Sequence, residues 1–85
     1  MKLKKPRFKN SDLSEVDFTE ADLTSSLFQN CDLEGARFEK TILEKADLRT
    51  SRNYSIDPEI NKIKKARFSI YGIAGLLNKY DIEIE

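Results

Sequence analysis

Five aspartates among the first 50 residues are the first candidates for chemistry, because paired carboxylates can act as general acid and base. Each stands one position before a Leu or Phe in a pattern with a period of five residues. The set comprises Asp12, Asp17, Asp22, Asp32 and Asp47. Because they recur with the pattern, we interpret them as a solvated, outward-facing structural row, and we assign no catalytic residue.

Cys31 is the single cysteine, and the chain has no histidine. Without histidine, a Ser or Cys nucleophile lacks its usual base. One cysteine cannot form an intrachain disulfide or supply the Cys and His cluster of a zinc site. Cys31 stands where other repeats carry a small residue, so we interpret it as a buried thiol that fills space. We therefore expect no enzyme activity, no metal and no cofactor.

A basic group in the second half of the chain could bind phosphates. It comprises Lys62, Lys64, Lys65 and Arg67. Its alternation with Ala66 and Phe68 favours the outer side of a strand instead. The chain has 15 Lys+Arg and 15 Asp+Glu, so zero net charge gives no overall attraction to nucleic acid or to an anionic membrane. We expect no direct contact with either.

The N-terminus gives no targeting signal. Residues 1–7 are basic but no apolar run follows them, and no later stretch reaches the roughly 20 apolar residues of a membrane span. We expect a cytoplasmic protein.

A repeat of five residues organises most of the chain. Large apolar residues occupy every fifth position: Phe8, Leu13, Phe18, Leu23, Phe28, Leu33, Phe38, Leu43 and Leu48. A straight helix would scatter this series around its axis, and a straight strand would place it on alternate faces. The series can share one interior only if the chain turns once per repeat. This predicts a β-solenoid with coils about 4.8 Å apart.

Two stretches show the repeat motif most clearly: Ala21-Asp22-Leu23-Thr24-Ser25 and Ala46-Asp47-Leu48-Arg49-Thr50. They resemble the pentapeptide-repeat family, whose pattern is a small residue, Asp or Asn, Leu or Phe, and two variable positions. Nine consecutive repeats cover residues 6–50. The resemblance implies a right-handed quadrilateral β-helix with four repeats per coil. Residues twenty apart would then stack, placing Phe8 under Phe28 and Phe18 under Phe38.

After Thr50 the repeat lapses, and we predict a loop over residues 51–60. The motif returns in phase near Phe68, so residues 61–68 are predicted as a last strand. We therefore divide the chain into a β-helix over residues 1–68 and a C-terminal part over residues 69–85.

Ser69 is a suitable N-cap for an α-helix from Ile70 to about Tyr80. We expect this helix to cap the solenoid, whose end would otherwise expose apolar surface. Gly72 and Gly75 weaken a helix and indicate close packing against another segment. The candidate interface residues are Ile70, Ile73, Leu76, Leu77 and Tyr80. The final residues 81–85 alternate like a short strand, which could pair with a coil edge or with a second chain.

These features favour a non-catalytic binding or scaffold module that acts through its outer faces and C-terminal helix. The sequence does not name the protein partner. A homodimer through the helix or through an open end of the solenoid is also expected.

The family resemblance implies an alternative function. Some members resemble duplex DNA in shape and charge, bind type II topoisomerases such as DNA gyrase, and protect them from quinolones. Nine repeats give about two and a quarter coils, or roughly 10 Å of stack, which equals about three base-pair steps. Together with zero net charge, this short length counts against mimicry.

Overall fold

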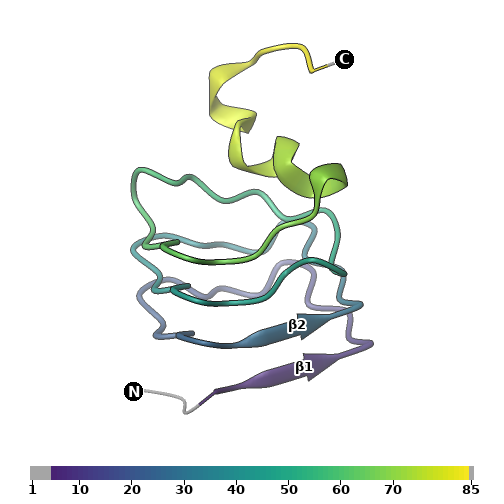
Figure 1. Ribbon diagram of the computed structural model, residues 1–85, viewed down its shortest axis with the longest axis vertical. Coiled ribbons are helices and arrows are strands. Elements are labelled where there is room, and N and C mark those ends of the chain that lie inside the picture. The colour runs from purple at the N-terminus through teal and green to yellow at the C-terminus, as the bar shows by residue number, and fades with distance from the viewer. Residues whose placement is uncertain (1–4, 85) are drawn as a thin grey trace.

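The chain winds into stacked coils of twenty residues (Figure 1). The computed structural model describes residues 5–84. Strand β1 (Arg7–Lys9) pairs in parallel with β2 (Leu27–Gln29), with Phe8 opposite Phe28. Single parallel bridges continue the same register around the coil: Asp12 to Asp32, Asp17 to Arg37, Asp22 to Ile42 and Leu27 to Asp47. A bridge every five residues and a repeat of twenty make each coil four-sided.

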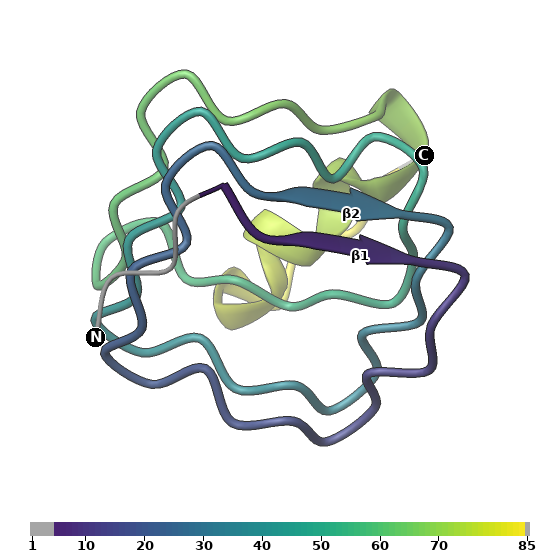
Figure 2. The same ribbon diagram turned by 90° about the horizontal axis from the view of Figure 1, so that it is seen from below.

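The solenoid is right-handed. Seen from the N-terminal end, the chain runs clockwise as it moves away from the viewer (Figure 2). Its corners fall at every fifth residue, where the backbone has positive φ, as at Glu15 and Ser25. Gly35, with φ of 74°, is the one glycine among these corners, so ordinary side chains hold most of the turns. A left-handed residue costs about 1–2 kcal/mol, which the stacking must offset.

The interior is a stack of large apolar side chains, as the spacing predicts. Phe8 stacks on Phe28 with ring centroids 4.9 Å apart, and Phe18 stacks on Phe38 at 5.2 Å. Phe18 also meets the edge of Phe28 across the interior, at 5.9 Å. Leu23, Leu33 and Leu43 are at most 1% exposed. Each fully buried Leu or Phe stabilises the fold by about 1.5–3 kcal/mol.

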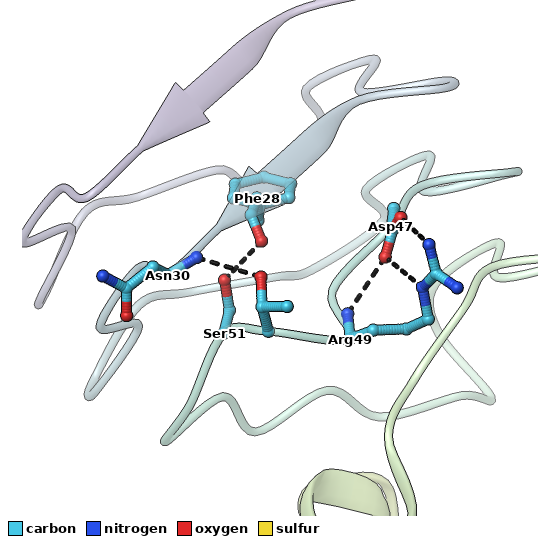
Figure 3. A network of polar contacts seen from close by, with 6 residues as sticks. Phe28, Asn30, Asp47, Arg49 and Ser51 are labelled. Atoms are coloured by element: carbon cyan, nitrogen blue, oxygen red, sulfur yellow. Dashed lines mark hydrogen bonds and ion pairs between the residues drawn. The ribbon is translucent and has the colours of Figure 1, made fainter.

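The small inward position also carries polar side chains, and these bond to the coil below. The Ser51 hydroxyl donates to the Phe28 carbonyl at 2.6 Å (Figure 3). The Thr41 hydroxyl donates to the Phe18 carbonyl at 2.8 Å. Asn61 donates to the Phe38 carbonyl at 2.8 Å. Each bond spans 23 residues, so these three buried groups are paired by the same register as the core, whereas the buried Ser26 hydroxyl has no partner among the described residues.

Residues 51–60 keep more contact with the solenoid than a plain loop would. The Arg52 N–H donates to the Cys31 carbonyl, and the Lys40 N–H donates to the Ile60 carbonyl, both at 3.0 Å. Between these points Tyr54 and Ile56 turn inward and are 4% and 1% exposed. Bridges from Ile42 to Lys62 and from Asp47 to Arg67 then continue the stack. The top of the core is thus built by Ile56, at the small inward position twenty residues after Ala36, and by Tyr54, which lies outside the five-residue register.

The C-terminal segment is a pair of 3-10 helices, so the prediction of one α-helix over residues 70–80 is wrong. They are η1 (Ile70–Leu76) and η2 (Asn78–Tyr80). Ser69 is the N-cap of η1, and its side chain accepts a hydrogen bond from the Gly72 N–H, as predicted. Gly72 and Gly75 of η1 lie against Tyr54 of the coil, and glycine at these two positions weakens an α-helix. None of the described helices is long and apolar enough to cross a membrane.

Candidate functional site

Gly72 and Gly75 fit η1 onto the solenoid through contact with Tyr54. A Cβ atom at Gly72 would lie 2.0 Å from the Tyr54 hydroxyl oxygen, and one at Gly75 would lie 2.1 Å from the Tyr54 carbonyl oxygen. The Gly75 carbonyl accepts a hydrogen bond from the Ile56 N–H at 2.9 Å. The glycines are therefore required by close approach, and their partner, Tyr54, is a residue that the repeat pattern does not mark.

The five candidate interface residues divide into an outer and an inner group. Ile70 is 86% exposed, while Ile73 and Tyr80 are 46% and 48% exposed. Leu76 packs against the buried core, and Leu77 is half-buried. Tyr71, which the sequence analysis left out of the set, is 99% exposed. An outward surface at the C-terminal end therefore consists of Ile70, Tyr71 and Ile73, with Tyr80 on the following turn.

Polar contacts fasten η2 to the turn after Ile56. The Lys79 ammonium pairs with Asp57 at 3.2 Å and with Glu59, and the Tyr80 hydroxyl donates to Glu59 at 2.8 Å. The bond from Lys79 to Glu59 raises the pKa of the ammonium, and the bond to Glu59 raises the pKa of the Tyr80 hydroxyl. Burial raises the pKa of Tyr54, an effect partly opposed by the Ser69 side chain.

The recurring aspartates hold corners. Asp17 accepts hydrogen bonds from the side chain and N–H of Thr19, which lower its pKa, and Ser14 does the same for Asp12. Arg49 binds Asp47 through two nitrogens, at 3.0 and 2.9 Å, and this contact lowers the pKa of Asp47 (Figure 3). These carboxylates therefore have local structural partners. In the described chain no three His, Cys, Asp or Glu side chains gather as a metal site would require.

The coil separates opposite charges that cancel in the sequence. Two adjacent sides of the solenoid are formed by residues 10–21 in one coil and residues 30–41 in the next. Together these residues include seven acidic and two basic ones, and we call these two sides the acidic half. The other two sides, within residues 5–9, 22–29, 42–49 and 62–69, carry nine basic and three acidic residues; we call them the basic half. Assigning each residue its position within a coil of twenty would have found this separation, which net charge hides.

The basic group at residues 62–67 joins other cations on the basic half. Lys65 and Arg67 line one open groove with Lys5, Arg7 and Lys45. Ala66 is half-buried while Lys65 and Arg67 are exposed, but Lys65 stands at a corner with φ of 62°, so the predicted strand over residues 61–68 is instead two single bridges, at Lys62 and Arg67, on either side of a turn. Cys31 is fully buried, and its thiol lies 3.4 Å from the Phe8 and Gln29 carbonyls. It fills the interior and is not part of a surface site.

Comparisons with known proteins concern the repeat and its coil. A family model described as "Pentapeptide repeats" matches in 8 copies, over residues 2–30 and 17–52. Two of the solved structures that match are of trypsin-treated variants of QnrB1, a plasmid-mediated fluoroquinolone resistance protein. The first is 14% identical with a TM-score of 0.48, and the second is 17% identical with a TM-score of 0.41.

The chain is shorter than these structures. The matches cover 93% of this chain but only 44% and 45% of the two solved chains. No curated protein sequence matches this one.

Proposed function

Since this chain belongs to the pentapeptide-repeat family, we propose that it is a non-catalytic binding module that pairs with a second copy through its C-terminal surface. One observation carries the proposal: Ile70, Tyr71 and Ile73 expose apolar side chains on η1. Residues 69–78 contain no charged side chain, in a chain that is 35% charged. An uncharged surface can meet its own copy across a two-fold axis without like-charge repulsion. The outer faces of the coils then remain free for a different protein.

The test is the solution mass of the intact chain, by light scattering over a concentration series. We expect the chain to associate and Ile70→Glu to lower the mass by removing the pairing through η1, because the change places two carboxylates in that interface. Ile70 is 86% exposed, so the change leaves the fold intact. Gln29→Glu is the matched control, since it adds the same charge at an exposed coil position and should leave the mass unchanged. An intact chain that stays monomeric would refute the pairing.

A second candidate function is imitation of duplex DNA toward a type II topoisomerase such as DNA gyrase. The acidic half favours it, because seven acidic residues against two basic ones give these two sides the charge that a mimic needs. A gyrase supercoiling assay tests it directly. Inhibition that disappears in Glu15→Lys/Glu20→Lys supports mimicry, and no effect at any concentration excludes it.

A further inference from the structure

The segment that follows η2 has an alternating pattern and a free surface. Asp81, Ile82, Glu83 and Ile84 follow the last helix, and the sequence continues with Glu85. Ile82 and Ile84 are 55% and 54% exposed, and Glu83 is also exposed. We call residues 81–84 the tail. Apolar and acidic side chains alternate along it, as they do in a strand with one apolar face and one charged face.

Strand β1 shows the complementary pattern at the opposite end of the molecule. Arg7 and Lys9 are exposed, whereas Phe8 between them is half-buried against the core. Basic and apolar side chains therefore alternate along β1, with the apolar one inward. Among the described residues β1 pairs only with β2, so it is the edge of its sheet.

The free edge of β1 carries backbone groups that do not bond to β2. On the coil above, the Leu27 N–H donates downward to the Pro6 carbonyl at 2.9 Å. Arg7 lies directly below Leu27 in the same register, so its N–H points away from β2. Unpaired N–H and C=O groups on an edge strand are a template for a further strand.

We propose that the tail of one copy adds to the free edge of β1 on a second copy, as a further strand of the stack. Ile82 or Ile84 would then cover the half-buried ring of Phe8, and the carboxylates of Asp81 and Glu83 would lie beside Arg7 and Lys9. Main-chain bonds supply affinity in such strand addition, and the alternate side chains supply the register. Opposite charges on neighbouring strands favour this pairing over that of two tails or two edges.

The tail cannot reach β1 of its own chain. The two segments lie at opposite ends of a molecule whose longest extent is 37 Å (Figure 1). The contact is therefore between different surfaces of two copies, and it repeats along a row of molecules unless a rotation closes it. It uses neither Ile70 nor Tyr71, so it is independent of the pairing through η1.

The test uses the full chain carrying Ile70→Glu, which removes the pairing through η1. Light scattering over a concentration series is expected to show growth beyond a dimer in this parent. Arg7→Glu/Lys9→Glu reverses the charge of the β1 edge, and Asp81→Lys/Glu83→Lys reverses the charge of the tail. Each is expected to weaken association about tenfold, because attraction becomes like-charge repulsion. Mixing the two reversed chains should restore assembly, since the reversed tail of one complements the reversed edge of the other.

Two further variants separate strand addition from simple charge attraction. Ile82→Pro keeps the charges of the tail but removes an N–H, so it should also prevent association. Glu15→Lys/Glu20→Lys reverses two exposed carboxylates on the coil and should have no effect on association. The proposal would be overturned if the Ile70→Glu parent stays monomeric or if the mixture of the two reversed chains does not assemble. It would also be overturned if the Ile82→Pro chain still assembles, or if the coil control loses as much association as the charge-reversed chains.

Discussion

The coils over residues 6–50 and the C-terminal part over residues 53–84 both bury apolar side chains, but they do so by different means. In the coils the stacking contacts join residues twenty apart, and the same kind of contact recurs. Phe8 on Phe28 and Phe18 on Phe38 are two instances of it. In the C-terminal part a single side chain, Tyr54, fits against two glycines of η1, and nothing repeats.

This difference in packing determines how far the loss of one side chain destabilises the rest of the molecule. A coil residue has neighbours above and below, so removing it disturbs three levels of one cooperative stack. The C-terminal helices rest on one layer, and their outer surface is exposed at Ile70, Tyr71 and Ile73. We therefore expect local opening of the C-terminal part at a lower free energy than global unfolding.

The largest expected effect tests the stack. Phe28 is fully buried between Phe8 and Phe18, so Phe28→Ala should lower the free energy of unfolding by about 3–5 kcal/mol. Phe68, half-buried beside Tyr54 with ring centroids 5.6 Å apart, is the matched position under the C-terminal helices. Phe68→Ala should cost less, about 2 kcal/mol. Denaturant unfolding monitored by circular dichroism measures both, and equal losses would contradict the comparison.

The next effect tests the fit of η1. Gly75→Ala places a Cβ atom against the Tyr54 backbone, which cannot rotate away, and should cost about 1–3 kcal/mol. Native-state hydrogen exchange should locate the loss, because the Ile56 N–H, which bonds the Gly75 carbonyl, should exchange faster. The coil amide of Arg37 should stay protected. Ala74→Ser, an exposed change one residue away, is the control and should stay within about 0.5 kcal/mol.

The coils were predictable because their contacts repeat. The period of five marks the buried positions, and the four-repeat coil that the family resemblance implies places Phe18 under Phe38. The separation into acidic and basic halves was also present in the sequence, but only for a reader who already knew that a coil has twenty residues. Net charge averaged it away.

The C-terminal part was predictable only in outline. Ser69 signalled a helix start, and Gly72 and Gly75 signalled close approach. Their partner could not be read, because Tyr54 lies in a stretch that has left the repeat. The helix type also escaped prediction, since the N-cap and the apolar spacing that predicted an α-helix do not specify how tightly the chain winds. A tertiary contact that occurs only once produces no periodic pattern in the sequence.

Alkaline pH should separate the two regions next. Burial raises the pKa of Tyr54 above its ordinary value of 10.0, so the unfolded chain loses this proton first as pH rises. The stability that Tyr54 contributes is present in full below about pH 10 and is lost as pH rises through its folded-state pKa. The pKa values of Tyr80 and Lys79, both in η2, are also raised, so these two groups likewise lose their contribution to stability as pH rises.

The expected result is loss of the C-terminal contacts above pH 10 while the coils persist. Hydrogen exchange and tyrosinate absorbance, recorded together, measure it. Tyr54→Phe should remove most of the response, because Tyr54 is the buried member of the three. If coil amides lose protection at the same pH as the Ile56 amide, the two regions unfold as one unit and the comparison fails.

The smallest expected effect concerns the exposed ion pairs. Lys79→Met removes the contacts of the ammonium with Asp57 and Glu59, and Arg49→Met removes the equivalent contact with Asp47 in the coil. Exposed ion pairs contribute little, so neither change should lower global stability measurably. The two variants should nevertheless differ in local opening. Few other contacts hold η2 to the coil, whereas the corner at Asp47 is bridged to the coils above and below it.

Hydrogen exchange at low salt should therefore show faster opening near Ile56 in Lys79→Met and no change near Asp47 in Arg49→Met. Added salt should shrink the first difference, since screening weakens the same pairs in the unchanged chain. The pKa of Glu59 gives a second measurement. The hydrogen bond from Lys79 is the main cause that lowers it, so Lys79→Met should raise it. A Glu59 pKa that does not move would mean that the ammonium is not fixed there in solution. The C-terminal helices would then be held without this ion pair, by the contact between Tyr54 and the two glycines and by the bonds from Ile56 to Gly75 and from Tyr80 to Glu59.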